Sequence, residues 1–424
     1  MINFLVAILI ASIFIFDWLF FVMGVGGRAM TWVPEIIAIF IALSIPFKTA
    51  TSKNINLPLK YVFLFCVYLA HILIGFLLND ITGWTMLAGL RIYTKFIPIF
   101  LIPLIFPFSD RAFKNIVLWI FALSMLQLPV VVWQRFVQYA TSLSGDPMGG
   151  TLGVSTSGIL AIYLIVIISF LISFYFKEQI SFPAFLASLI AAFIPITLNE
   201  TKISFILLPI SFLIPAVYIK GKTDVIIRLL TVFMLLLVTF VVFKGVYDYW
   251  AAKRWGYGIE GFISQPKIFK QYNKNRLDPM KNAVIHAMAD SRFAFFGHGA
   301  GNVSEGFTKK LSGKYVKEGE FYNVSVTFAQ LMWETGILGT FFFFLFPIFV
   351  FWDAVKLCKQ DGWPGAFSLG MIGFATFFTL SMFYTFTINA NVLIFIFFLA
   401  AGQLVSQYAR TDEIRFDTRQ ADVL

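Results

Sequence analysis

Three cationic side chains stand inside or beside long apolar stretches, where a charge is costly. Arg91 and Lys95 occur in GLRIYTKFIPIF, and Lys202 begins an apolar run after NET. Residues four apart on a helix share a face, so Arg91 and Lys95 are expected side by side. Charges in such stretches are functional candidates by default, and arginine is the better clamp for phosphate. These residues therefore predict an anion-binding site.

Each cation also has a simpler interpretation. Arg91 and Lys95 could reach along the helix to the membrane interface, as basic side chains near helix ends do. Lys202 could pair with Glu200, two residues earlier in ITLNETKIS. The spacing alone leaves both alternatives open.

A second group of candidates lies in a long polar segment. Arg276 stands just before Asp278 and Pro279, a pair typical of a helix start. Free backbone N–H groups at such a start, beside an arginine, would bind an anion. The sequence predicts a helix over 279–290, with these residues on its apolar face: Val284, Ala287 and Met288.

The stretch after this predicted helix, DSRFAFFGHGAGN, supplies two more candidates for holding a ligand, Arg292 and His298. His298 lies in the turn GHGAG, whose glycines would let the backbone approach a ligand closely. An ordinary loop explains the turn equally well. The histidines His71, His286 and His298 show no metal-binding spacing, so neither a metal nor another cofactor is expected.

The elements that must position these residues follow from the composition. The chain of 424 residues is 59% hydrophobic and 13% charged, whereas soluble domains carry about 25% charged residues. Its apolar stretches are continuous and roughly 17–25 residues long, the length of a spanning helix. The two cysteines, Cys66 and Cys358, form no disulfide framework or metal motif. No cleavable signal peptide is expected, because the first apolar stretch is too long and has no basic leader.

The predicted fold class is an all-α polytopic membrane protein with about 12 transmembrane helices and one large extracytoplasmic loop. The predicted spans are 3–22, 32–47, 59–79, 87–107, 115–138, 157–176, 182–198, 203–220, 228–247, 326–352, 366–386 and 391–407. The predicted regions are 1–247 with the first nine helices, 248–325 as the large loop with short helices, 326–407 with the last three helices, and 408–424 as a cytoplasmic tail.

Lysine and arginine in the short loops predict the orientation. With the N-terminus inside, every inner loop carries Lys or Arg, for example KTATSKN, SDRAFKN and KGKTDVIIR. The outer loops, such as NDITGW and TINAN, are nearly free of positive charge, as the positive-inside rule requires. The segment 248–325 then lies outside, and Arg91, Lys95 and Lys202 gather at the outer boundary. Long loops escape the charge rule, so the net positive charge of that segment does not argue against this topology.

The order of these features resembles the O-antigen polymerase and ligase (Wzy/WaaL-like) superfamily of integral membrane glycosyltransferases. AQLMWETGILG (329–339) is similar to the family's helix start Q-x-x-x-E-x-G followed by two apolar residues and Gly, and GGTLGVSTSGILAIYL (149–164) to its glycine-rich approach to a middle span. The ligase branch places a histidine before an asparagine ahead of that helix, where this chain reads Phe321-Tyr322-Asn323. The hairpin residue is usually Arg in the family, and here it is Lys202. The missing histidine favours the polymerase branch.

The resemblance implies a GT-C-like enzyme of the bacterial cytoplasmic membrane that joins undecaprenyl-diphosphate-linked repeat units into a surface polysaccharide on the outer face. Arg91, Lys202 and Arg276 would stabilise the charge that develops on the diphosphate leaving group. The implied partners are lipid-linked glycans, membrane lipids, a flippase and a chain-length regulator, and no nucleic acid.

The acceptor hydroxyl would need a general base. Glu200, Asp290 and Glu320 are outer carboxylates, and Glu200 is the candidate included in the catalytic set. Glu334 is expected to serve helix packing or to cap the junction between loop and helix. Two alternative functions stay open, an O-antigen ligase that moves finished glycan to a lipid acceptor and a transporter or flippase of lipid-linked sugar.

Overall fold

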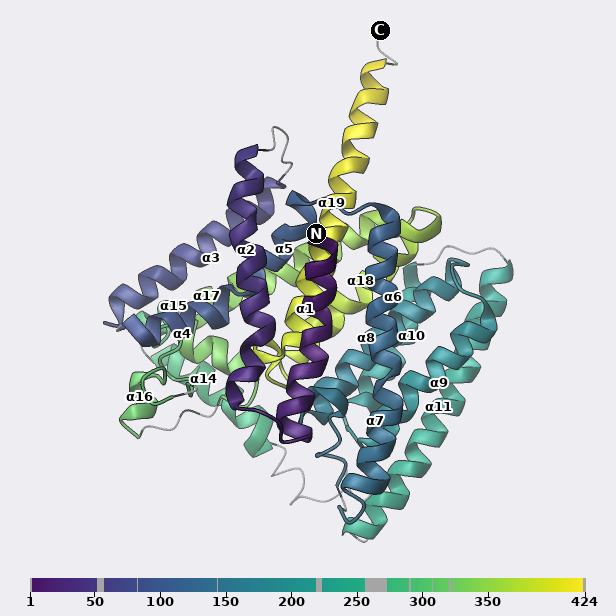
Figure 1. Ribbon diagram of the computed structural model, residues 1–424, viewed down its shortest axis with the longest axis horizontal. Helices are drawn as coiled ribbons and strands as arrows, with labels where there is room; N and C mark the ends of the chain where they lie inside the picture. Colours follow the sequence, from purple (N-terminus) through teal and green to yellow (C-terminus); the bar gives the residue numbers. More distant parts are fainter. Residues whose placement is uncertain are drawn as a thin grey trace.

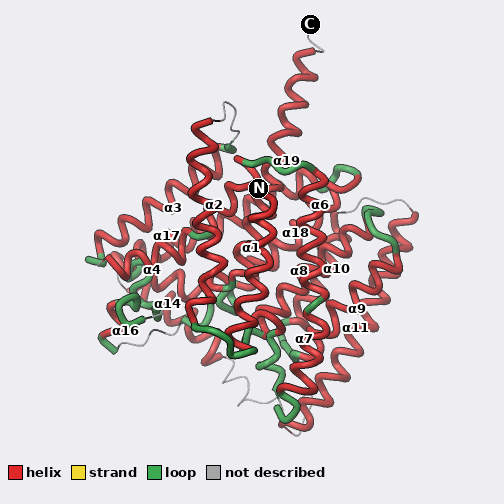
Figure 2. The backbone as a smooth tube through the Cα atoms, viewed as in Figure 1, coloured by secondary structure: helices red, strands yellow, loops and turns green. Residues whose placement is uncertain are grey.

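The computed structural model describes residues 2–51, 57–81, 83–142, 144–218, 223–255, 273–289, 291–306, 308–319, 322 and 324–421. Within these ranges the regular secondary structure is entirely helical (Figure 1; Figure 2). This confirms the predicted all-helical architecture of a multi-pass membrane protein. The apolar composition forces the backbone to satisfy its own hydrogen bonds, which helices do within one segment.

The first half of the described chain contains eleven α-helices, some of them extended by a π-helical or 3-10 turn. They are α1 (Ile2–Asp17) with η1 (Trp18–Val22), η2 (Arg28–Trp32), α2 (Val33–Thr51), α3 (Leu59–Leu78), α4 (Gly83–Thr94), α5 (Phe96–Ile105), α6 (Asp110–Met125), α7 (Gln127–Trp133) with η3 (Gln134–Gln138), η4 (Gly150–Leu152), α8 (Ser157–Phe176), α9 (Phe182–Leu198), α10 (Ser204–Tyr218) and α11 (Thr223–Trp255).

The second half begins with short helices and ends with three long ones. They are η5 (Asn273–Leu277), α14 (Asp278–Ala289), α15 (Ser291–Phe296), α16 (Lys314–Lys317), α17 (Thr327–Leu357), α18 (Gly362–Ser381), η6 (Thr387–Asn389) and α19 (Asn391–Ala421). The predicted large outer segment, 248–325, thus starts within α11 and continues through 256–272, which lie outside the described residues.

Nine helical segments of the described chain are long and apolar enough to cross a membrane. A tenth candidate is the pair α4 and α5, whose axes are bent by 46°. The apolar helices α9 and α10 are shorter, at 17 and 15 residues. At about 1.5 Å per residue, neither reaches the roughly 30 Å of a hydrocarbon core. These twelve pieces coincide with the twelve predicted spans, and the count of twelve complete crossings stays a prediction.

Contacts between distant segments show which helix ends lie at the same end of the molecule. At one end Lys60 forms an ion pair with Asp353, Lys177 donates to the Gln360 carbonyl at 2.8 Å, and Arg228 pairs with Glu178. These residues belong to or flank loops that the charge pattern predicts on one side. Both chain termini lie toward the same upper end of the view in Figure 1.

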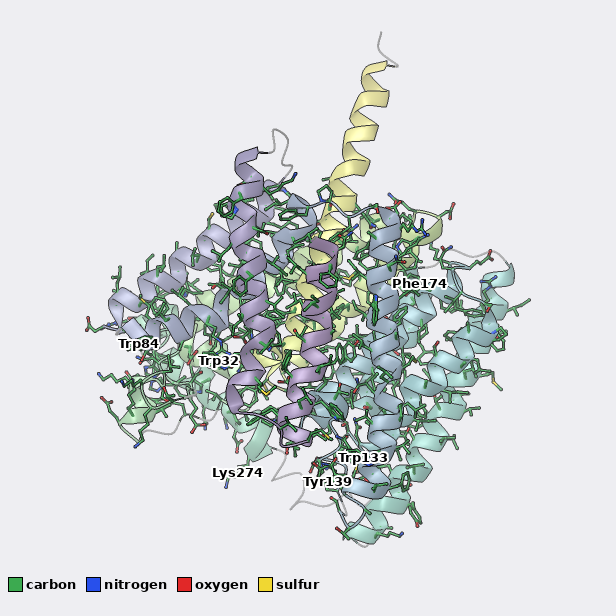
Figure 3. All side chains as sticks on the ribbon, in the orientation of Figure 1. Trp32, Trp84, Trp133, Tyr139, Phe174 and Lys274 are labelled. Carbon is green, nitrogen blue, oxygen red and sulfur yellow. The ribbon has the colours of Figure 1, made fainter. Side chains whose placement is uncertain are left out.

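The opposite end carries many of the aromatic side chains that typify a membrane interface. In Figure 3 the labelled residues of the lower half are Trp32, Trp84, Trp133, Tyr139 and Lys274, whereas Phe174 lies in the upper half. This lower end is the one to which the charge pattern assigns the outer loops. It is called the outer end below.

The centre of the molecule is formed by α8, α18 and α19. About 89% of the span windows of α8 and α19 is buried inside the protein, against 11% for the peripheral α11. Stacked phenylalanine rings fill the space around these helices, for example Phe96 with Phe398 and Phe378 with Phe397, whose centroids lie 4.2 and 4.1 Å apart. The rigid centre supports the ends of the helices that build the site.

Helix α17 is broken near its outer end at Gly336, where φ is +66° and ψ is −169°. The turn after α15 inserts there: the His298 N–H donates to the Trp333 carbonyl at 2.8 Å. A Cβ on Gly297 would lie 2.7 Å from the Gly336 nitrogen, and one on Gly336 would lie 2.7 Å from the Ala294 oxygen. Glycine is therefore required on both sides, because two backbones meet without space for side chains.

Candidate functional site

A cavity of about 610 Å³ lies at the outer end. Its walls come from the end of α1 with η1, the start of α2, one side of α4, the approach to α8, the loop after α15, and the start of α19. Its charged and amide-bearing lining residues are Asp17, Glu35, Arg91, Lys95, Glu305, Asn389 and Asn391, and its largest aromatic ones are Phe21, Trp32 and Trp84. Segments far apart in the sequence thus combine charged and apolar groups in one cavity.

The bend between α4 and α5 positions the two cations of this cavity. Pro98 stands in the first turn of α5, four residues after Thr94, the last residue of α4. Proline has no N–H to donate to the carbonyl four residues earlier, and its ring clashes with that carbonyl, so the helix breaks at this point. Because α2 packs along α5, the 46° bend turns α4 away from that contact. The cavity occupies the space between α2 and α4, with Lys95 at the bend.

Glu35 of α2 binds both cations. It forms an ion pair with the Arg91 guanidinium and accepts from Lys95 Nζ at 3.0 Å. Lys95 also donates to the Asn391 side chain at 2.8 Å, and the guanidinium of Arg91 stacks 4.3 Å from the centre of the Trp32 ring. The Lys95 and Glu35 side chains are each 7% exposed, whereas that of Arg91 is 35% exposed. Arg91 is therefore the cation that a ligand reaches first.

Two side chains of α17 hold the loop that forms one cavity wall. Glu334 is fully buried and accepts from the Tyr93 hydroxyl at 2.6 Å and from the Val303 N–H at 3.2 Å. One turn earlier, Gln330 donates to the Ser304 hydroxyl and accepts from Asn389, both at 3.1 Å. Spacing of four residues places both side chains on one helix face. They position Ser304 and Asn389, which line the cavity.

The structure places Glu200 and Lys202 away from the lining of this cavity. Glu200 accepts from the Arg135 guanidinium at 2.7 Å, and both side chains are almost fully buried. Arg135 also contacts the Met148 sulfur at 3.4 Å. Glu200 has a positive φ of 54°, which lets the tight turn between α9 and α10 close over Arg135. A catalytic role of Glu200 or Lys202 stays a prediction.

Arg276 does not line the cavity. Its guanidinium donates to the Ser325 carbonyl at 3.2 Å and lies 5.1 Å from the centre of the Tyr384 ring. Tyr384 in turn packs against Gly158 near the start of α8, close to the lining residues Thr156 and Ile159. Neither Arg276 nor Tyr384 lines the cavity, so a catalytic role of Arg276 stays a prediction.

The helix after Arg276 differs from its predicted form in two respects. α14 covers Asp278–Ala289, but a π-helical turn, Asn273–Leu277, precedes it directly. The start at Asp278 is therefore a continuation of a helical turn and offers no free N-terminus for an anion. Of the three residues predicted on its apolar face, Ala287 is buried and Val284 half-buried, but Met288 is 79% exposed. The buried residues of α14 are Pro279, Ala283 and Ala287.

His298 and Arg292 do not line the cavity either. The His298 ring is parallel to Trp333 at 5.9 Å and lies among the rings of Phe293, Tyr315 and Tyr322, whereas Arg292 is exposed on α15. The GHGAG turn is packed against the backbones of α17 and α4, and its last residue, Gly301, lines the cavity. Its predicted close approach to a ligand stays a prediction. The predicted candidates Asp290 and Glu320, and also Phe321 and Asn323, lie outside the described residues.

The sequence interpretation missed the carboxylates of this site. Asp17 in FIFDWLFF and Glu35 in WVPEIIAIF stand in or beside apolar stretches, so the argument applied to Arg91 would have found them. Among the described residues, no group of three or more His, Cys, Asp or Glu side chains is arranged to hold a metal ion.

The chain matches no known protein-family model, and no curated protein matches it in sequence.

Proposed function

We propose that the protein is a membrane glycosyltransferase that joins lipid-diphosphate-linked oligosaccharide repeat units into a polysaccharide. In this proposal the outer end faces the exterior of a bacterial cytoplasmic membrane, where a flippase delivers the repeat units. The observation that carries the proposal is the cavity at that end, lined by Arg91 and Lys95 together with apolar and aromatic side chains.

The two cations suit a diphosphate leaving group. When the bond between the sugar and the diphosphate breaks, negative charge develops on the phosphate oxygens, and fixed donors stabilise it most effectively in a site of low dielectric. Loss of one such donor typically raises the barrier by about 2.7–4 kcal/mol. The guanidinium group of Arg91 is partly exposed and can exchange its bonds to Glu35 for bonds to a phosphate. Lys95 meanwhile keeps its hydrogen bond to the Asn391 side chain.

The surroundings of the cavity suit a lipid tail. Trp84 and Leu87 line the cavity from α4 and are 63% and 53% exposed, so the cavity borders the lipid-facing surface of that helix. On α2, Ile39 and Phe40 continue an exposed apolar surface away from Glu35. A prenyl chain lying between α2 and α4 would keep its head group beside Arg91. The volume, about 610 Å³, falls within the roughly 300–1,000 Å³ of small-molecule sites and accommodates a diphosphate with its first sugars.

The preference for a polymerase over a ligase rests on the sequence. Phe321-Tyr322-Asn323 has no histidine at the position where the ligase branch carries one before its asparagine. The preference for an enzyme over a transporter rests on the position of the charges. Arg91, Lys95 and Glu35 gather at one end, whereas transporters bind their substrate near the middle of the membrane.

Deletion of the gene in its host tests this proposal, with lipid-linked glycans separated by size. A strain without the polymerase should accumulate single repeat units on the lipid carrier. Long chains retained on the carrier would instead identify a ligase, and repeat units trapped on the inner face would identify a flippase.

Complementation connects the activity to the cavity. Arg91→Ala should fail to restore long chains. Arg111→Ala, which removes an exposed arginine at the opposite end of the protein, should restore them. Normal chain length with Arg91→Ala would contradict the proposed site.

A further inference from the structure

Asp17 is the carboxylate of the cavity whose position has no structural explanation. It is the last residue of α1, in the apolar run FIFDWLFF, and its side chain is half-buried in the cavity lining. The helix continues past it into η1, so Asp17 stands inside the apolar helical segment Ile2–Val22. A charge inside an apolar segment loses hydration. This effect does not favour aspartate at this position for stability.

The other carboxylates of the cavity are less suited to accept a proton. Glu35 is bonded to Arg91 and Lys95, so its oxygens are already occupied by donors. Glu305 is exposed at the rim. Within the described part of the chain, Asp17 accepts no hydrogen bond, and it shares the cavity lining with Lys95 and Glu35. Asp17 thus presents available oxygens to the same space that Arg91 lines.

We propose that Asp17 is the general base that takes the proton from the acceptor sugar hydroxyl. This inference rests on the proposed transfer from a lipid diphosphate. In the step, the acceptor oxygen forms a bond to C1 of the donor sugar while its proton moves to the Asp17 carboxylate. The bond from C1 to the diphosphate oxygen breaks, and its electron pair leaves with the lipid diphosphate, which Arg91 and Lys95 stabilise. Water then removes the proton from Asp17.

The position of Lys95 supports this assignment. It bonds Glu35 and lines the same cavity as Asp17 and Arg91, so the proposed base and the proposed leaving-group site share one space. A single displacement of this kind inverts the configuration at C1, so the new linkage should have the opposite anomeric configuration to the donor.

The test uses the purified full chain in lipid vesicles with a lipid-diphosphate-linked repeat unit. Chain extension is followed on gels, and donor binding is followed separately by native mass spectrometry. Asp17→Asn keeps the shape of the side chain and removes its basicity. It should slow extension about 100-fold or more, the usual contribution of a general base, while donor binding stays within about twofold of the unmodified protein.

Two further variants separate catalysis from structure. Asp146→Asn makes the same change at an exposed loop position of the outer end, outside the cavity, and should extend chains normally. Asp17→Ala should regain activity when sodium formate is added and not when sodium chloride is added. A purely structural role would not respond to an external base.

The outcomes distinguish the two proposals. If the unmodified protein does not extend chains, the proposed function fails. If it does and Asp17→Asn extends them within threefold of its rate, the assignment of Asp17 alone is overturned. Equal losses in donor binding and in rate would also overturn it, because Asp17 would then act only as a counterion of Lys95.

Discussion

Replacing Glu35 by glutamine removes the negative charge that bonds both Arg91 and Lys95. Loss of one partner of a buried ion pair typically destabilises a protein by about 3–5 kcal/mol, since the other charge stays buried. Lys95 contributes most of this loss because it is 7% exposed. Arg91 is 35% exposed and stacked on Trp32, so its share is at most about 1 kcal/mol. Lys95 keeps its bond to Asn391, which places the expected total near the lower limit, about 3 kcal/mol.

The assay is unfolding in mixed detergent micelles, followed by tryptophan fluorescence. The second variant is Lys95→Met, and the third combines both changes. Because replacing a whole buried pair by neutral groups is often tolerated, the double variant should be more stable than Glu35→Gln alone. Glu318→Gln, at an exposed position, is the control and should change stability by less than about 0.5 kcal/mol.

Two results would refute this reasoning. One is a Glu35→Gln protein as stable as the unmodified one, which would show that the cations are well solvated in its absence. The other is a double variant that is as unstable as Glu35→Gln alone. It would show that the unpaired, buried charge of Lys95 is not the cause of the instability.

Three other changes follow from the described contacts. Gly336→Ala should destabilise the protein by more than about 2 kcal/mol, because a Cβ there lies 2.7 Å from the Ala294 oxygen and the backbone has φ of +66°. The yield of folded protein after detergent extraction measures this loss, and a normal yield would contradict the close contact at Gly336. Glu334→Ala removes the acceptor of the Val303 N–H and should increase protease cleavage at 301–306. Cleavage at the rate of the unmodified protein would contradict this role of Glu334. Pro98→Ala restores an N–H for helix continuation and should reduce the 46° bend, which should lower the rate of chain extension. An unchanged rate with a straightened helix would show that the bend is not needed for activity.

The sequence predicted the helices well wherever the apolar run was continuous and its ends were polar. The predicted spans 157–176 and 182–198 coincide with α8 and α9, because lysine, serine and asparagine stand directly at their limits. The break within the predicted span 87–107 was missed, although Pro98 signals it. The predicted span contains three prolines, Pro98, Pro103 and Pro107, and was expected to continue through them. The bend depends on how α2 packs against only one of its halves.

The site was predicted only in part, for a physical reason. Arg91 and Lys95 were found because their spacing is local, but their partner Glu35 is 56 residues from Arg91 and reaches it only after α2 packs on α5. Arg135 and Glu200, 65 residues apart, likewise form a pair that spacing cannot reveal. Both Arg135 and Asp17 lie within predicted spans, so the rule on charges in apolar stretches would have selected them. Which charges meet, however, is decided by tertiary packing.

The central claim is that the cavity between α2 and α4 holds the diphosphate of a lipid-linked glycan. A structure of the protein with bound undecaprenyl diphosphate, in lipid nanodiscs, tests this most directly. The account predicts phosphate oxygens within hydrogen-bond distance, about 3 Å, of the Arg91 guanidinium or Lys95 Nζ, with the first isoprene units along Trp84 and Leu87. A diphosphate bound at Lys202, at Arg276 or at the opposite end of the protein, with this cavity empty, would contradict it.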